Sequence, residues 1–379
     1  MKLGFVLFEY FPFGGLQRDC VKTALACASR GHEVSILTRT WQGDRPDGIR
    51  IELFGRNGWT NVARNRNWLK LLNAAVPRMA LDAVVGFNKM PALDVYFGAD
   101  PCYVHKVSES KPFWYPWLPR FRHYAALERA VFAQGHRTQI LQLTPHEIPV
   151  YKRIYGTEDR FHLLPPMVPR YTFSFEEQER QRRRLRHEHG WNPDEKLLLF
   201  VGSDFRRKGL DRVLQGMGSL GMTLRQQTRL VVLGRCDPGR FARLARRLGL
   251  QDRVHFLGGR LDAPDWMLAS DLLVHPAYVE TAGAVLLEAV THGLPVLTTE
   301  SCGYAFHIQR ARAGEVIREP FSPSAFLAAL EEMLKSPQKR LAFSRQGLQY
   351  AATEDLYQCH QRASEIIEAT VHNKLSRTP

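Results

Sequence analysis

Two carboxylates, Glu280 and Glu288, are separated by seven residues that could hold an anion between them. Between them lies a run of three residues with almost no side chain, Ala282, Gly283 and Ala284. The apolar run 272–274 predicts a buried strand, and the apolar run after Glu280 predicts a helix that ends at Gly293. A ligand could therefore approach the unpaired N–H groups at the helix start. An ordinary strand–helix unit with a capping and a solvated glutamate explains the same residues.

A basic pair, Arg207 and Lys208, follows another predicted strand, residues 196–202, and precedes a helix that begins near Leu210. Arginine offers a fork of N–H donors and lysine a point charge, so together they could neutralise a diphosphate. A solvated basic turn explains the pair alone. Its place on the same predicted sheet edge as the small-residue run favours the anion site.

The first half of the chain carries a second, weaker phosphate-binding pattern. The predicted strand 3–8 is followed by Gly14 and Gly15 and by a helix over residues 16–29, and only glycine lets a backbone come so close to an anion. The spacing is neither GxGxxG nor GxxxxGK[ST], and a tight turn would also need these glycines. Asp100 follows the predicted strand 95–98, where a parallel sheet binds ligands, and is a candidate pocket carboxylate.

Strands and helices alternate along the whole chain, which predicts an α/β protein with two Rossmann-like domains whose parallel sheets face each other across a cleft. The further predicted strands are 33–38, 83–87, 139–143, 161–164, 230–234, 254–257, 271–275 and 295–298. The prolines of 165–169 predict a linker. We expect a first Rossmann-like domain over 1–167, a second Rossmann-like domain over 168–354, and a C-terminal helix, about 355–379, that packs back on the first domain.

The amino-acid composition limits the kinds of partner that the protein is expected to bind. The chain has 379 residues and a formal net charge of +14, which favours nucleic acid, anionic lipid or phosphorylated substrates. Its six cysteines form no CxxC pair, which argues against zinc and for reduced thiols in the cytoplasm. No signal peptide or membrane-spanning run is apparent. The arginine-rich run 176–190 also contains acids and predicts a helix with a solvated face.

The segment between Tyr103 and Phe132 interleaves aromatic and basic residues. Such a mixture suits a membrane interface, where Trp and Tyr lie at headgroup level and Lys and Arg meet anionic lipid. A partly buried helix pair with a basic outer face is a second interpretation, and stacking on single-stranded nucleic acid is a third.

Several motifs together resemble a known family. They are FPFGGLQRD from Phe11, VGFNKMP from Val85, GSDFRRKG from Gly202, His275-Pro-Ala, and Glu280 with Glu288. This set is similar to the lipopolysaccharide core glucosyltransferases that act on the heptose region, over nearly the whole chain. The two spaced glutamates and the RKG motif also resemble the wider class of retaining GT-B glycosyltransferases.

The resemblance implies a UDP-hexose donor bound mainly to the second domain. It implies that Glu288 holds the ribose, that Arg170 and Arg260 lie near the uracil and phosphates, and that Glu280 accepts from sugar hydroxyls. The backbone that would fix sugar and phosphate is Thr281, Ala282, Gly283, Ala284 and Val285. Gly14 and Gly15 would approach the donor from the first domain.

The resemblance further implies the catalytic set Asp100, Arg207, Lys208 and Glu280, with Asp100 touching sugar or acceptor. Cations aimed at the diphosphate would stabilise the developing charge, and because no DxD-type pair adjoins the phosphate loops, we expect neither a metal nor a cofactor. Retention would follow from front-face attack. The acceptor would be a phosphorylated inner-core heptose, reached by a cytoplasmic enzyme peripheral on the inner membrane.

One departure concerns the donor sugar. Thr281 stands where the family pattern has alanine and adds a hydroxyl and a methyl, so we expect a donor such as a UDP-N-acetylhexosamine or a galacto sugar instead of UDP-glucose. Alternatives are a UDP-sugar epimerase of the same architecture and a retaining transferase for another membrane-associated glycan. A nucleic-acid-binding protein would show steeply salt-dependent affinity, and a dehydrogenase lacks its GxGxxG fingerprint.

Overall fold

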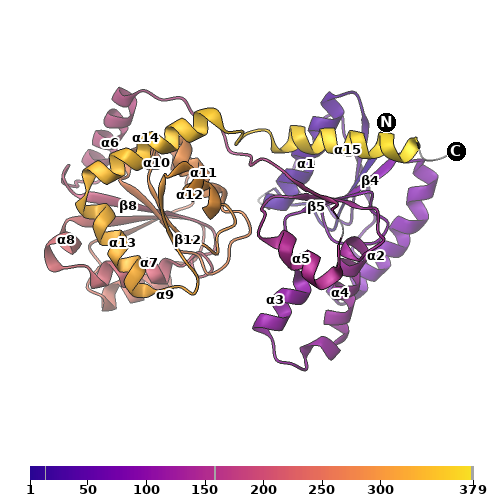
Figure 1. The fold of residues 1–379 in the computed structure, drawn as a ribbon, viewed down its shortest axis with the longest axis horizontal. Helices are drawn as coiled ribbons and strands as arrows, with labels where there is room; N and C mark the ends of the chain where they lie inside the picture. The colour runs from indigo at the N-terminus through magenta and orange to yellow at the C-terminus, as the bar shows by residue number, and fades with distance from the viewer. Residues whose placement is uncertain (13, 158, 377–379) are drawn as a thin grey trace. The chain divides into compact units, whose positions relative to one another are not determined.

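The computed structural model describes residues 1–12, 14–157 and 159–376. It contains two compact units, each built on one parallel sheet (Figure 1). The first unit comprises Met1–Met167 and Gln358–Pro379, and the second comprises Val168–Tyr357. The α/β class with two Rossmann-like sheets is confirmed. Each unit is described by itself below.

The first unit has a seven-stranded sheet in the order β3-β2-β1-β4-β5-β6-β7. Its strands are β1 Lys2–Leu7, β2 Glu33–Thr38, β3 Arg50–Leu53, β4 Ala83–Gly86, β5 Val95–Gly98, β6 Gln139–Gln142 and β7 Phe161–Leu163. All neighbouring pairs are parallel. The central strands are apolar because helices cover both faces, as parallel sheets require.

The helices of this unit are α1 Gly15–Ser29, α2 Asn61–Ala75, α3 Tyr103–Ser110, α4 Pro119–Phe132, α5 Glu147–Tyr155 and α15 Cys359–Leu375, with short 3₁₀ turns at Val76–Met79 and Tyr115–Trp117. The last helix, α15, lies beside α1 (Figure 1). Its residues Ala363, Ile367 and Val371 are fully buried in the core beneath it. Arg30, which directly follows α1, donates through Nε to Glu368 Oε1 of α15 at 2.7 Å.

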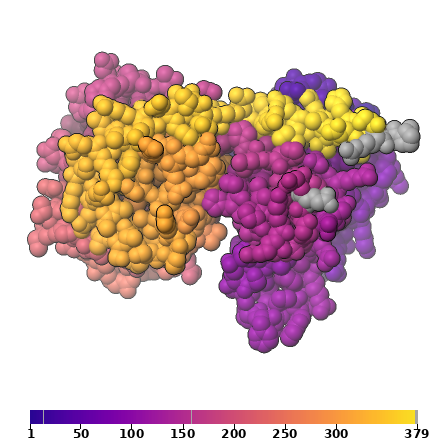
Figure 2. All heavy atoms as spheres, in the orientation of Figure 1, coloured from indigo at the N-terminus to yellow at the C-terminus, as the bar shows by residue number. Residues whose placement is uncertain are grey.

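Helix α3 and the start of α4 project from the first unit, visible as the purple lobe at the bottom of Figure 2. A single buried carboxylate fixes the inner end of this projection. Glu128, fully buried on α4, accepts from the backbone N–H groups of Tyr103 at 2.6 Å and Val104 at 3.1 Å, which open α3. Lys89 Nζ lies 2.6 Å from the same side chain and neutralises it.

The second unit has a six-stranded sheet in the order β10-β9-β8-β11-β12-β13. Its strands are β8 Lys196–Val201, β9 Thr228–Leu233, β10 Val254–Gly258, β11 Leu272–His275, β12 Val296–Thr299 and β13 Gly314–Ile317. Its helices are α6 Phe175–Glu188, α7 Leu210–Ser219, α8 Met222–Gln226, α9 Gly239–Arg247, α10 Ala263–Ala269, α11 Ala284–Thr291, α12 Ala305–Ala311, α13 Pro323–Lys335 and α14 Pro337–Thr353.

The prediction of a solvated face for the arginine-rich helix is wrong in part. Arg186 of α6 is 3% exposed, and its Nη2 lies 3.1 Å from Asp271 Oδ2. Arg182 binds the other oxygen of that carboxylate at 2.9 Å, and the backbone N–H of Leu197 in β8 donates to it at 2.8 Å. The alternation of acids and bases on α6 concealed a buried ion pair that ties the helix to the sheet.

Candidate active site

In the second unit, two loops leave the same sheet edge at the point where strand order reverses. Strands β8 and β11 are neighbours, with Leu198 beside Leu272 and Leu199 beside Leu273, while β9 and β12 continue outward in opposite directions. Ligands of open α/β sheets bind outside the carboxyl ends of strands at such a switch point. The loop 202–209 after β8 and the loop 276–283 after β11 both open there.

Three charged side chains meet between these loops. Lys208 Nζ and Arg207 Nη1 lie 2.9 and 3.1 Å from the same atom, Glu280 Oε2. Arg207 also donates through Nη1 to the backbone oxygen of Val279 at 3.1 Å, and its backbone N–H donates to Asp204 Oδ1 at 3.0 Å. The structure therefore brings together the predicted cations and the predicted carboxylate.

The ion pairs keep Glu280 charged. Burial alone would raise the pKa of this carboxyl, but His275, Lys208 and Arg207 reverse the effect and hold the pKa well below its usual range. His275 Nε2 is 3.9 Å from Oε2, beyond hydrogen-bond reach, so we attribute the shift mainly to the two cations. Burial lowers the pKa of His275, which leaves its fully buried ring neutral.

Glycine at two positions permits this geometry. Gly209 has φ of +78°, and a Cβ there would lie 2.0 Å from the backbone oxygen of Pro276, so only glycine lets the two loops approach. Gly283 has φ of +88° and stands at the N-cap of α11. Alanine at Gly209 would force the two loops apart, whereas alanine at Gly283 would meet only ordinary contacts and would strain the backbone at the helix start.

The small-residue run opens α11 as expected. Thr281 and Ala282 are half-buried, Gly283 and Val285 are buried, and Ala284 is exposed. The first N–H groups of a helix have no acceptor within the helix, so this start is suited to an anion. The backbone before it is fixed, because Glu280 N donates to Ser301 O at 3.1 Å and Tyr304 N donates to Ala282 O at 2.7 Å.

Glu288 lies one turn into α11 and is half-buried. The segment after Val168 runs beside Glu288. The pKa of Tyr171 is raised mainly by burial and, to a smaller extent, by the nearby Glu288 carboxylate. The centre of the Tyr171 ring lies 4.1 Å from that of the His292 ring. Arg170 is exposed with its guanidinium 3.8 Å above the Tyr357 ring. Arg170 and Glu288 therefore belong to the same part of the second unit.

Arg260 lies farther along the edge. It follows β10, and strands β9 and β8 separate β10 from β11. Its guanidinium is held by Asp262 through two contacts of 2.6 Å, Nε to Oδ1 and Nη2 to Oδ2. The structure places Arg260 on the predicted edge and outside the cluster formed by Glu280.

The remaining predicted residues belong to the first unit. Asp100 is exposed beyond the end of β5 and lines a cavity of about 490 Å³ at the switch point between β1 and β4. The backbone N–H of Phe8 donates to Asn88 Oδ1 at 2.8 Å and joins the two strand ends there. Gly14 is the N-cap of α1, and Gly15 is exposed with nothing within 4 Å of where a Cβ would be.

Sequence reasoning missed the charged wall of this cavity. Arg39, only 7% exposed, donates to Asn65 Oδ1 at 2.7 Å and pairs with Glu9 Oε1 at 3.1 Å, and Arg56 Nε lies 3.0 Å from the same atom. Glu9 and Arg39 each come shortly after a strand, β1 and β2, so their position at a carboxyl end was the available signal. Neither residue belongs to a motif of the family.

Within the part of the chain that the structure describes, no group of three or more His, Cys, Asp or Glu residues could hold a metal ion. Lys208 and Arg207, beside Glu280, are charged groups available to a diphosphate at that switch point. What the second unit offers is an anion site with a fixed carboxylate beside it. A nucleoside diphosphate with a polyhydroxyl group attached fits such chemistry.

Comparisons with known proteins define the class. A family model described as "Glycosyl transferases group 1" matches residues 181–350, which include both loops of the site. The fold and the class are those of a glycosyltransferase. More closely, the chain belongs to the family of the lipopolysaccharide glucosyltransferase WaaG of Escherichia coli (strain K12), to which it is 45% identical over 97% of its own length and 98% of the relative's.

Solved structures agree. A crystal structure of WaaG, a glycosyltransferase involved in lipopolysaccharide biosynthesis, has a TM-score of 0.86 and 44% identity, and covers 96% of this chain and 99% of that one. Anabaena Alr3699/HepE in complex with UDP and glucose has a TM-score of 0.72 at 16% identity, a likeness of fold alone. D-inositol 3-phosphate glycosyltransferase 2 of Catenulispora acidiphila is 30% identical over 44% of the chain.

Proposed function

We propose that the protein transfers a hexose, with retention of anomeric configuration, from a UDP-sugar to an inner-core heptose of lipopolysaccharide and so builds the outer core. One observation carries the proposal. Lys208 and Arg207 converge on Glu280 at the switch point of the second unit, in a chain that matches the WaaG family over nearly its full length. The site has the charge for a diphosphate and a carboxylate for a sugar.

The donor would lie along the second unit. Glu280 Oε2 takes both ion pairs, which leaves Oε1 for a sugar hydroxyl, while Glu288, one turn along α11, accepts from the ribose. The N–H groups at the start of α11 bind sugar or phosphate oxygens. Arg170 and Arg260 assist at the uracil and the phosphates.

The reaction follows from this charge arrangement. The bond between the anomeric carbon and the diphosphate oxygen breaks, and the pair of electrons leaves with UDP, whose growing negative charge Arg207 and Lys208 stabilise. The acceptor oxygen attacks from the same face and forms the new C–O bond, and its proton passes to a phosphate oxygen of the leaving group. The two cations supply the positive charge, so the reaction requires no metal.

The acceptor would occupy the cavity of the first unit. Asn61, Asn65 and Asn88 line it with amide groups, as carbohydrate hydroxyls require, and Arg56 and Lys106 supply positive charge for a phosphate on the heptose. Asp100 contacts the sugar or acceptor from this unit. The proposed donor and acceptor groups therefore occupy the switch points of the two sheets.

A panel of labelled UDP-sugars with heptose-terminated inner-core lipid tests the function and the donor together. Because Thr281 adds a hydroxyl and a methyl beside the sugar, we expect transfer from a UDP-N-acetylhexosamine or UDP-galactose to exceed transfer from UDP-glucose. Thr281→Ala should shift the ratio of kcat/KM towards UDP-glucose by about tenfold, the usual weight of one small group in a pocket.

Three results would speak against this. A clear preference of the wild-type protein for UDP-glucose removes the donor assignment, and absence of transfer from every donor removes the function. Interconversion of UDP-sugars without acceptor would favour an epimerase instead. Thr223→Ala, on helix α8, is the matched control and should leave the donor ratio unchanged.

We also propose that the enzyme works on the cytoplasmic face of the inner membrane and docks through residues 103–132. In the described residues no helix is both long and apolar enough to cross a bilayer. The tip of the projection exposes apolar rings: Phe113 is 84% exposed, Trp117 67% and Trp114 46%. Exposed arginines stand beside them at Arg120 and Arg122. The inner end of the segment packs in the core, where Val131 and Phe132 are fully buried.

If the protein docks through this tip, changing its residues should weaken binding to anionic membranes. Trp114→Ala and Trp117→Ala combined with Arg120→Gln and Arg122→Gln should reduce binding to vesicles containing anionic lipid by at least tenfold, since each basic residue contributes about 1 kcal/mol at such a surface. Co-sedimentation measures the binding. Arg78→Gln with Arg345→Gln, two exposed arginines outside the segment, should not change it. Unchanged binding of the four-residue variant refutes docking through the tip.

A further inference from the structure

The first unit holds a second cavity, of about 710 Å³, at the opposite edge of its sheet from the proposed acceptor site. Its wall includes Asp94, which precedes β5, and residues 136–139, which lead into β6. Both segments lie at amino ends of parallel strands, whereas Asp100 and Asn88 follow carboxyl ends. The cavity is therefore separate from the donor and acceptor sites proposed above.

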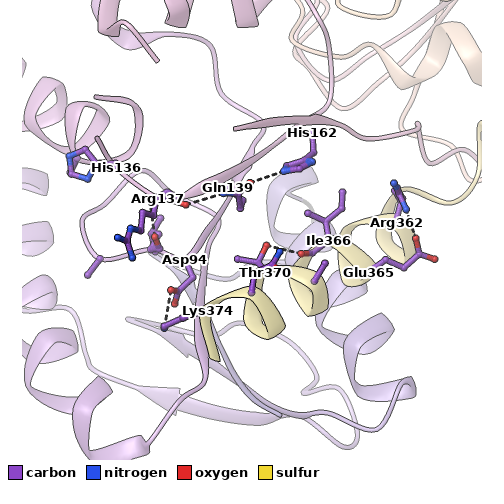
Figure 3. A pocket seen from close by; sticks show the side chains of 16 residues that line it. Asp94, His136, Arg137, Gln139, His162, Arg362, Glu365, Ile366, Thr370 and Lys374 are labelled. Atoms are coloured by element: carbon purple, nitrogen blue, oxygen red, sulfur yellow. Dashed lines mark hydrogen bonds and ion pairs between the residues drawn. The ribbon is translucent and has the colours of Figure 1, made fainter. Parts of the chain in front are cut away.

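One face of α15 forms the other wall (Figure 3). The lining positions on this helix recur every three or four residues from Arg362 to Lys374, which is one stripe of an α-helix. The neighbouring stripe, with Ala363, Ile367 and Val371, is buried in the core. Apart from Ile366, which is buried, the helix thus presents a stripe that the core leaves uncovered, and a ligand in the cavity would touch α15 and the sheet together.

The carboxylates of the cavity are already neutralised, and a cation remains. Lys374 Nζ lies 2.9 Å from Asp94 Oδ1, and Arg362 Nη1 lies 2.7 Å from Glu365 Oε2 (Figure 3). Arg137 lines the same cavity, and among the described residues its guanidinium has no ion-pair or hydrogen-bond partner. A guanidinium without a carboxylate suits a phosphate, which it can bind through two parallel N–H donors.

The rest of the lining favours a sugar over a nucleobase. Asn373 can exchange hydrogen bonds with hydroxyls, and Ile366 and Ala369 provide an apolar strip for the C–H face of a ring. Gln139 already binds Arg137 O and His162, so it offers only its second N–H and a remaining lone pair. Apart from two histidines, the lining has no aromatic ring on which a base could stack. The volume lies within the range of small-molecule sites, roughly 300–1,000 Å³.

We propose that this cavity binds a sugar phosphate, with the phosphate on Arg137 and the sugar against α15. Ligand bound to both walls stabilises the attachment of α15 to the first unit, because binding to the folded form alone raises its stability. The proposal does not rest on the transferase function, since none of its residues belongs to the proposed donor or acceptor site.

Calorimetric titration of the full-length protein with glucose 1-phosphate, in the presence of saturating UDP, tests the site. We expect saturable binding about tenfold tighter than that of inorganic phosphate or UMP, and Arg137→Gln should weaken it by at least tenfold, the effect of losing one charge-assisted contact. Arg78→Gln, an exposed arginine of the same unit outside the cavity, is the matched control and should bind as the wild type does.

Hydrogen exchange locates the ligand independently of affinity. Glucose 1-phosphate should slow amide exchange in α15 and around residues 137–139 in the wild type, and not in Arg137→Gln. The proposal is overturned by any of four results: no saturable binding, displacement by UDP, equal affinity for inorganic phosphate, or protection confined to the second unit.

Discussion

Lys208→Met should abolish most of the transferase activity while leaving the fold intact. The Lys208 ammonium is one of the two Lys and Arg cations that contact Glu280 at the switch point of the second unit. Removal of one preorganised donor to a developing negative charge typically costs about 10²–10³ in kcat. We expect a fall of that size in kcat with the preferred UDP-sugar and a much smaller change in KM for the acceptor.

The methionine retains the aliphatic stem that lies against Gly202, so the packing of the loop is preserved. Lys335→Met is the control, because Lys335 is exposed on α13 and pairs only with Glu331, at 2.7 Å. Its kcat should stay within about twofold of wild type, as for most surface ion pairs. A kcat of Lys208→Met close to that of the control would exclude Lys208 from the chemistry.

Glu128→Ala should destabilise the first unit by about 3–5 kcal/mol, the usual cost of breaking a buried ion pair from one side. The substitution leaves the Lys89 ammonium, whose side chain is only 11% exposed, without its carboxylate. It also removes the acceptor of the Tyr103 and Val104 N–H groups. Urea unfolding gives the free energy of unfolding, and amide exchange of α3 shows whether the projection comes loose.

Two further variants separate the cost of the unpaired Lys89 charge from the cost of the lost hydrogen bonds to α3. Glu109→Ala, 68% exposed on α3, should change the free energy of unfolding by about 0.5 kcal/mol or less. Glu128→Leu combined with Lys89→Met removes both charges and should recover much of the stability lost by Glu128→Ala. Equal destabilisation in the single and double variants would show that the hydrogen bonds to α3, rather than the unpaired lysine, are responsible.

The Glu128 carboxylate should also make the stability of the first unit depend on pH. Burial alone would raise the pKa of Glu128, but Lys89 and the N–H groups of α3 outweigh it, so the folded-state pKa is lowered. A group with a lowered pKa binds fewer protons when folded, so its stabilisation is complete above the unfolded value of about 4.3 and is lost as the pH falls towards the folded value. The wild type should therefore lose stability in acid over this range, and Glu128→Ala should lose less.

Much of the architecture could be predicted, because parallel strands buried on both faces stand out as short apolar runs. Residues 33–38 and 95–98 match β2 and β5 residue for residue. Strands β3 and β13 were missed. β3 is Arg-Ile-Glu-Leu at the edge of its sheet and is partly exposed, and β13 begins at Gly314 and carries Glu315, so neither has an apolar run.

The site could be predicted only where motif and strand end coincide. Arg207, Lys208 and Glu280 were found by their place after β8 and β11, and they lie in contact. The ion pair of Arg186 with Asp271 was not predicted, because two partners 85 residues apart produce no periodic pattern in the sequence. Glu128 was likewise treated as one charge among many in an aromatic and basic segment, although it holds that segment in place.

The position of α15 in the chain affects how the first unit folds during synthesis. Cys20, Ala24 and Cys27 of α1 are fully buried in a core that α15 completes, yet α15 follows the whole second unit in the chain. At 5–20 residues per second, all of Val168–Tyr357 is made first, which takes on the order of ten seconds or more. Throughout that interval the nascent first unit carries an open apolar groove, a natural binding site for chaperones, and it becomes complete only after α15 has been made.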